Sequence, residues 1–66
     1  MTITVNGDRH EVPEGLNVAA LLAHLGLPPD RVALERNRDI LPRPQWSTTA
    51  VQPHDNYEIV HLVGGG

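Results

Sequence analysis

The 66-residue chain contains no cysteine and no lysine. Without cysteine it can form neither a disulfide framework nor a thiolate metal site, and this usage fits a reducing cytoplasm. Without lysine it offers no ε-amine, so it cannot form lysine-linked chains of itself. No apolar run approaches the roughly 20 residues of a membrane span, and the first residues lack the charged region of a signal peptide. We therefore expect a cytoplasmic protein that is not embedded in a membrane.

Aromatic residues are also scarce, at 3% of the chain, and the formal net charge is −3. An acidic domain with few aromatics and no basic stripe is not typical of nucleic-acid binding. A chain of this length forms one small domain that buries only about 60% of its unfolded surface, which leaves little room for a catalytic cleft. The sequence has no P-loop, nucleophile elbow or paired-carboxylate motif. We therefore expect a protein that is not an enzyme.

The four histidines raise the question of a metal site. Their spacing gives no pair one helical turn apart and no known zinc pattern, and no cysteine is present to assist. We predict solvated surface histidines and no bound metal or other cofactor. The residues concerned are His10, His24, His54 and His61.

The first 27 residues have the pattern of a β-hairpin followed by a helix. Strands are expected at residues 2–5 and 8–12, joined by a type I′ turn at Asn6-Gly7, because that turn needs positive φ at both positions. Asn17 suits the helix N-cap, and Gly26 fits the left-handed position after the last turn. Apolar residues recur at i, i+3, i+4 and i+7 and give the helix one buried face, namely Val18, Leu21, Leu22 and Leu25.

The remaining elements complete an α+β pattern in which hairpins are segregated from one helix. We expect a mixed sheet of about five short strands packed on that helix. Trp46 lies in an irregular segment that begins at Pro42, and we expect it to cap one edge of the core. The further strands are expected at residues 32–36, 39–41 and 57–63, with turns at residues 37–38 and 53–56.

The last three residues, Gly64, Gly65 and Gly66, follow directly on the final expected strand. Glycine loses more backbone freedom on ordering than any other residue. We therefore divide the chain into a folded domain of residues 1–63 and a flexible tail of residues 64–66. Without Cβ atoms, this tail can enter a narrow channel and present the Gly66 carboxylate at its tip. A frayed terminus without a function is the alternative.

Four blocks of the sequence form a combination that is specific for a chain of this length. They are the helix that ends in Gly26-Leu27, the segment Val32-Ala33-Leu34-Glu35-Arg36-Asn37, Ile40-Leu41-Pro42-Arg43 with Trp46 three residues on, and the ending Glu58-Ile59-Val60-His61-Leu62-Val63-Gly64-Gly65-Gly66. Together they resemble the ThiS family of sulfur carrier proteins from thiamin biosynthesis, over the whole chain. The resemblance implies a ubiquitin-like β-grasp fold, with the last strand lying centrally beside the first.

The resemblance also implies a function for Gly66. A ubiquitin-activating-type (ThiF-type) adenylyltransferase would use ATP to convert the Gly66 carboxylate to an acyl adenylate. Sulfur from a cysteine desulfurase would then displace AMP and leave a thiocarboxylate, which donates its sulfur to a ThiG-type thiazole synthase. ATP would be used by the partner enzyme, and this chain would be a cosubstrate.

The alternation along the last strand predicts which residues meet these partners. Tyr57 and Ile59 share one face, which the analogy with ubiquitin-like domains assigns to the core beneath the helix. The intervening residues then lie on an open sheet face, where exposed apolar side chains indicate a partner surface. The alternative is that these residues are merely β-formers. The predicted interface consists of Glu58, Val60, Leu62 and, near the tail, His61.

Three other functions stay open at this point. The small subunit of molybdopterin synthase uses the same terminal thiocarboxylate with another acceptor. A protein modifier would pass the activated Gly66 to a lysine of a substrate. A β-grasp binding module without tail chemistry would tolerate a residue added after Gly66. A further hypothesis is that three arginines form a rim that pairs with acidic groups of a partner; they are Arg36, Arg38 and Arg43. The alternative is that these arginines are simply solvated.

Overall fold

The computed structural model describes residues 1–63 of the chain. Their elements are β1 (Thr2–Val5), β2 (Asp8–Glu11), α1 (Val18–His24), the 3₁₀ helix η1 (Pro29–Arg31), β3 (Val32–Arg36), β4 (Asp39–Ile40), the 3₁₀ helix η2 (Arg43–Thr48) and β5 (Asn56–His61). The predicted tail at residues 64–66, and with it the domain boundary after residue 63, lies outside the described residues.

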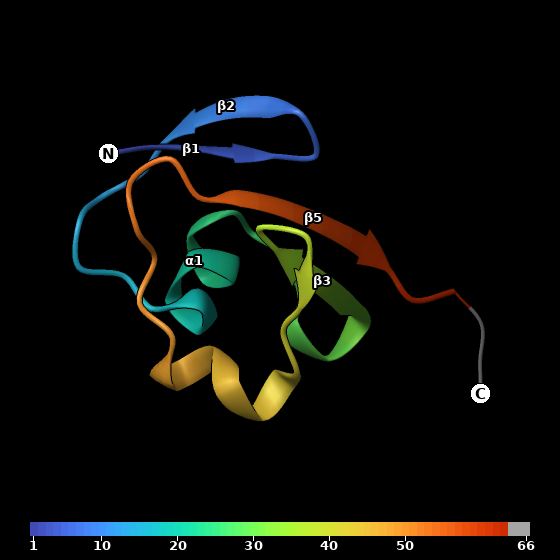
Figure 1. The fold of residues 1–66 in the computed structure, drawn as a ribbon. Coiled ribbons are helices and arrows are strands. Elements are labelled where there is room, and N and C mark those ends of the chain that lie inside the picture. The colour runs from blue at the N-terminus through green and yellow to red at the C-terminus, as the bar shows by residue number, and fades with distance from the viewer. Residues whose placement is uncertain (64–66) are drawn as a thin grey trace.

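The strands form one mixed, five-stranded sheet in the order β2-β1-β5-β3-β4 (Figure 1). β5 pairs in parallel with β1, where Val5 lies opposite Tyr57. It pairs antiparallel with β3 over the register from Val32 opposite His61 to Arg36 opposite Tyr57. The last strand therefore lies at the centre of the sheet beside the first strand, which is the expected topology.

The β1–β2 turn has the predicted conformation. Asn6 has φ 51° and Gly7 has φ 84°, the two positive values that a type I′ turn requires. Asparagine tolerates this region better than most residues because its short polar side chain can form local hydrogen bonds. The hairpin is thus confirmed, with its second strand one residue shorter than expected.

Both ends of α1 are capped as the sequence predicts. The side chain of Asn17 accepts a hydrogen bond from the Ala20 N–H at 2.8 Å. At the other end, the Leu27 N–H donates to the Leu22 carbonyl at 2.9 Å and the Gly26 N–H donates to the Ala23 carbonyl at 3.1 Å. These two bonds define a Schellman motif, which stops the helix before Pro28.

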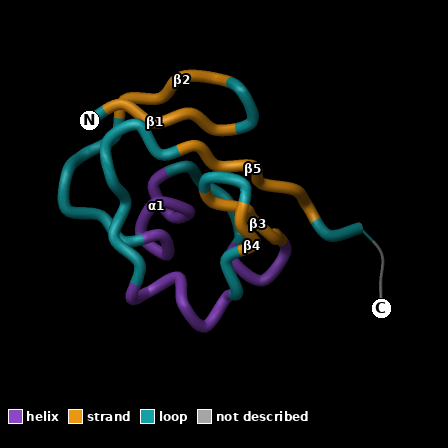
Figure 2. Tube along the Cα trace, in the orientation of Figure 1, coloured by secondary structure: helices purple, strands orange, loops and turns teal. Residues whose placement is uncertain are grey.

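The core lies on one side of the sheet, beneath α1 and η2 (Figure 2). Fully buried side chains come from α1 and from three of the strands; they are Leu21, Leu22, Val18, Ile3, Val32 and Tyr57. Burying a large aliphatic side chain contributes about 1.5–3 kcal/mol to folding. A one-sided core leaves the opposite face of the sheet available for other contacts.

Three further segments differ from the sequence-based expectation. β4 ends at Ile40 instead of residue 41. Residues 43–48 were expected to be irregular but form η2, since Pro44 in its first turn fixes a helical φ and Trp46 is buried against the core. The last strand begins at Asn56 instead of Tyr57 and ends at His61 instead of Val63. The reason is that β3 begins at Val32, the partner of His61, and only one hydrogen bond, from the Leu62 N–H to the Arg31 carbonyl, follows that pair.

Candidate functional site

One face of the sheet carries exposed side chains from β3, β4 and β5. Along β5, Tyr57 and Ile59 are 0% and 5% exposed, whereas Val60 is 59% exposed. This confirms the predicted assignment of the two faces of the last strand. We name this surface the open face and define it by Ala33, Glu35, Ile40, Glu58 and Val60.

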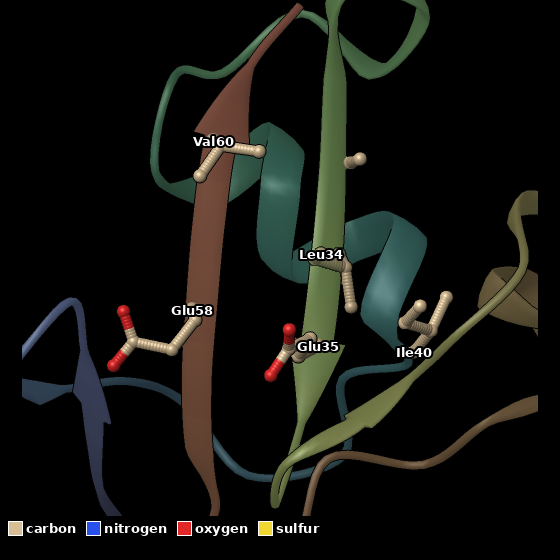
Figure 3. A pocket seen from close by; sticks show the side chains of 6 residues that line it. Leu34, Glu35, Ile40, Glu58 and Val60 are labelled. Atoms are coloured by element: carbon tan, nitrogen blue, oxygen red, sulfur yellow. The ribbon is translucent and has the colours of Figure 1, made fainter.

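Strand register brings the residues of the open face together. Ala33 is paired with Val60, and Glu35 with Glu58. Glu35 is also the partner of Ile40 on β4. Because directly opposed residues have Cβ atoms about 4.5–5.5 Å apart, the five side chains form one continuous surface. The hollow that they line measures about 200 Å³, and Leu34 also lines it. Figure 3 shows Glu35, Ile40, Glu58 and Val60 around it.

Apolar exposure continues from the open face toward the end of the described chain. Leu62 is 54% exposed and Val63 is 96% exposed. The Leu62 N–H donates to the Arg31 carbonyl at 2.8 Å, which fixes this segment beside the start of β3. Contiguous exposed apolar residues indicate a surface for a partner.

The sequence-predicted site residues thus fall into three groups. Glu58 and Val60 line the hollow of the open face. Leu62 and His61 are exposed but do not line it, and His61 pairs with Val32 at the end of the ladder. The third group is Gly64, Gly65 and Gly66, which lie outside the described residues.

A side-chain amide holds the second half of β5. The Nδ2 of Asn6 donates to the Ile59 carbonyl at 3.0 Å, and the Oδ1 of Asn6 accepts from the Ile59 N–H at 2.7 Å. The amide therefore replaces a backbone partner where β1 has already turned. This bridge orients the segment that carries Val60.

A buried carboxylate holds the beginning of β5. Asp55 is 4% exposed, and its Oδ1 accepts a hydrogen bond from Asn37 Nδ2 at 3.1 Å. Its Oδ2 accepts three hydrogen bonds, from Arg36 Nε at 3.0 Å, the Tyr57 hydroxyl at 2.9 Å and the Gln52 N–H at 2.9 Å. This cluster ties the start of β5 to the turn between β3 and β4.

The hydrogen bonds also decide the ionisation of this cluster. Burial by itself raises the pKa of the Asp55 carboxyl, but the bonds from the Gln52 N–H and from the surrounding side chains outweigh burial and lower the pKa. Burial and the bond to Asp55 raise the pKa of the Tyr57 hydroxyl, which therefore keeps its proton and donates it. Asp55 is a structural anion at neutral pH.

Trp46 lies at the edge of the core, as predicted. It is 4% exposed, and its Nε1 donates to the Leu41 carbonyl at 2.8 Å. The guanidinium of Arg43 lies 5.4 Å from the centre of the indole ring and donates to the Val32 carbonyl at 3.4 Å. Arg36 is engaged with Asp55. Two of the three arginines of the hypothetical rim thus have partners inside the domain.

The described residues contain no obvious place for a metal. Among residues 1–63, no three His, Asp or Glu side chains are grouped closely enough to hold a metal ion. Within the same range, the structure has no helix with the length and hydropathy needed to cross a membrane.

Sequence reasoning missed several residues that position the site. The turn pattern of residues 53–56 does not reveal that Asp55 is buried, and Asn6 was noted only for its turn. Alternation along β3 places Ala33 and Glu35 on the face opposite Val32, so that signal was available. Their meeting with Val60 depends on strand register, which single-strand patterns do not supply.

Comparison with known proteins gives consistent results. The ThiS family model matches residues 2–66. A crystal structure of the thiamine biosynthesis protein ThiS from Geobacter metallireducens is 36% identical, with a TM-score of 0.87 and complete coverage of both chains. A computationally designed protein based on human erythrocytic ubiquitin has a TM-score of 0.51 at 18% identity, covering all of this chain and 94% of that one. The fold is therefore ubiquitin-like, as expected.

One curated relative is much longer than this chain. A thiazole synthase from Magnetococcus marinus is 38% identical over all 66 residues of this chain, which span 20% of the length of that protein. The family model and the ThiS structure both extend over nearly the whole sequence. On these grounds, the chain belongs to the ThiS family.

Proposed function

We propose that this chain is a sulfur carrier of thiamin biosynthesis whose working group is the Gly66 carboxylate. The observation that carries the proposal is the full-length similarity to a thiamine biosynthesis protein, at 36% identity and a TM-score of 0.87. The family match also includes the three terminal glycines. The protein acts in the cytoplasm, as a cosubstrate of partner enzymes and without a bound cofactor.

Activation makes the carboxylate chemically useful. A carboxylate is a poor electrophile because its charge repels nucleophiles and its leaving group would be oxide. A ubiquitin-activating-type adenylyltransferase binds ATP, and a Gly66 oxygen attacks the α-phosphorus as pyrophosphate leaves. The resulting acyl adenylate has AMP as a good leaving group, and enclosure in the partner's site contributes through proximity.

Sulfur then enters at the acyl carbon. A persulfide supplied by a cysteine desulfurase displaces AMP, and a thiol cleaves the S–S bond to leave the thiocarboxylate on Gly66. The chain has no cysteine, so no side-chain thiol competes as the carrier atom. The thiocarboxylate donates its sulfur to a thiazole synthase that builds the thiazole ring.

The folded domain provides the surface by which the partner enzymes bind this protein. Val60 on β5 and Leu62 just after β5 are 59% and 54% exposed, and both precede the tail closely in the sequence. We propose that the adenylyltransferase and then the thiazole synthase bind these two residues together with Glu58 and His61. The hydrogen bonds that hold β5 would keep this bound surface in a constant position relative to the rest of the domain while the enzyme acts on Gly66.

A pyrophosphate-exchange assay with the host's adenylyltransferase tests the activation step. The wild-type chain should support exchange between ATP and pyrophosphate, and a chain lacking Gly66 should not. Lysine conjugates in cell extract that require ATP would point instead to a protein modifier. Exchange that is equally efficient with and without Gly66 contradicts the proposal.

A further inference from the structure

Two like charges face each other across the centre of the open face. Glu35 on β3 is paired directly with Glu58 on β5. Like charges in this position destabilise a sheet. Among residues 1–63 the ion pairs are Met1 with Glu11 and Arg36 with Asp55, so neither Glu35 nor Glu58 has a cationic partner there. The domain thus carries a like-charge repulsion that no ion pair among its described residues relieves.

The hollow beside this pair is apolar on its other sides. Ile40, 78% exposed, and Val60, 59% exposed, stand on either side of it, and Ala33 lies between them on β3. Figure 3 shows the Glu35 and Glu58 carboxylates at one end of the hollow and Val60 toward the other. The hollow measures about 200 Å³. An occupant that fits it has an apolar stem and a cationic head.

We propose that this hollow receives one arginine side chain of the adenylating partner, an inference that rests on the proposed function. The aliphatic stem lies along Ile40 and Val60, as long cationic side chains do on apolar surfaces. The guanidinium lies between Glu35 and Glu58. Its planar array of five donors can bind both carboxylates at once, which a lysine ammonium does less well.

The charge of the chain argues against a second copy as the occupant. Each copy carries a formal net charge of −3, so two copies repel each other over longer range. Of its own arginines, Arg36 and Arg43 are already engaged with Asp55 and Trp46. A basic partner surface is complementary, and such complementarity accelerates encounter and fixes orientation.

The test measures equilibrium binding to the adenylyltransferase without ATP, by titration calorimetry. The variant is the double substitution Glu35→Gln with Glu58→Gln, which removes both charges and keeps the side-chain size. The matched control is Glu14→Gln with Asp30→Asn, two exposed positions outside the open face that change the net charge equally. Pyrophosphate exchange by the wild-type chain is recorded separately, so that failure of the proposed function is recognised independently.

We expect the double variant to raise the Kd at least about tenfold and the control to change it less than about twofold. Sodium chloride should weaken wild-type binding more steeply than binding of the double variant. The melting temperature of the double variant should equal or exceed that of wild type, because the opposed charges are gone. Equal Kd values for the double variant and the control would overturn the inference, as would a lowered melting temperature or the absence of any wild-type binding.

Discussion

Asn6 and Ile59 lie 53 residues apart in the sequence and exchange two hydrogen bonds, at 3.0 Å and 2.7 Å. The amide of Asn6 thereby acts as one more rung of the ladder between β1 and β5. The same residue supplies the positive φ of the hairpin turn. One asparagine thus sets both the turn and the position of the strand that leads to the tail.

Asn6→Gly separates these two roles, because glycine keeps the positive φ and loses both hydrogen bonds. We expect the free energy of unfolding to fall by about 1–3 kcal/mol, at about 0.5–1.5 kcal/mol for each bond. Amide hydrogen exchange should accelerate most at Ile59. Unchanged protection of the Ile59 N–H would contradict the role given to the bridge.

Asp55→Asn tests the buried carboxylate. We expect a loss of about 1.5–3 kcal/mol at neutral pH, since hydrogen bonds to a charged group are replaced by weaker ones. Because the folded-state pKa is lowered, the ionised carboxylate stabilises the fold fully above its ordinary pKa of 3.8. That contribution disappears as the pH falls below 3.8 toward the folded-state value.

Urea unfolding at a series of pH values measures this effect. The wild-type free energy of unfolding should fall more steeply below pH 3.8 than that of Asp55→Asn. Glu14→Gln, at an exposed loop position, serves as the control and should keep the wild-type acid dependence. Parallel wild-type and Asp55→Asn curves would show that Asp55 does not govern the acid response.

A matched pair of substitutions tests the two faces of β5. Val60→Asp on the open face should change stability by about 1 kcal/mol or less, as surface substitutions do. Ile59→Asp places a charge in the core and should unfold the domain or cost more than about 3 kcal/mol. Val60→Asp should nevertheless weaken binding to the adenylyltransferase, as should Leu62→Asp. Chemical denaturation and calorimetry together check the separation, and tight binding by both variants would contradict the docking surface.

Local features could be predicted because each depends on a few neighbouring residues. The Asn6-Gly7 turn, the Asn17 cap and the Gly26 stop all have short-range causes, and all are confirmed. The end of the last strand could not be predicted in this way. Its length is set by where β3 begins, which is a property of the partner strand.

The same distinction applies to the site. Alternation correctly placed Val60 outside and Tyr57 inside. The opposed pair of Glu35 and Glu58 depends on the register of two strands that are far apart in the sequence. The residues around Asp55 likewise come from three separate turns and strands, so no local sequence pattern indicates that Asp55 is buried.

Deleting Gly66 should abolish sulfur transfer without lowering the melting temperature. Every core residue of the described chain lies at or before Ile59, so we expect the folded domain not to depend on the terminal glycine. Circular dichroism during heating provides the comparison with wild type. Loss of the cooperative thermal unfolding transition on this deletion would contradict the division into a folded domain and a tail.

Intact-protein mass spectrometry tests the central claim most directly. The chain is incubated with ATP, the host's adenylyltransferase and a sulfur source, and the product is fragmented to locate any change. The sulfur-carrier account predicts a mass gain equal to the replacement of one oxygen by sulfur, localised to Gly66 and absent from the chain lacking Gly66. An unchanged mass in the presence of an active enzyme would contradict it.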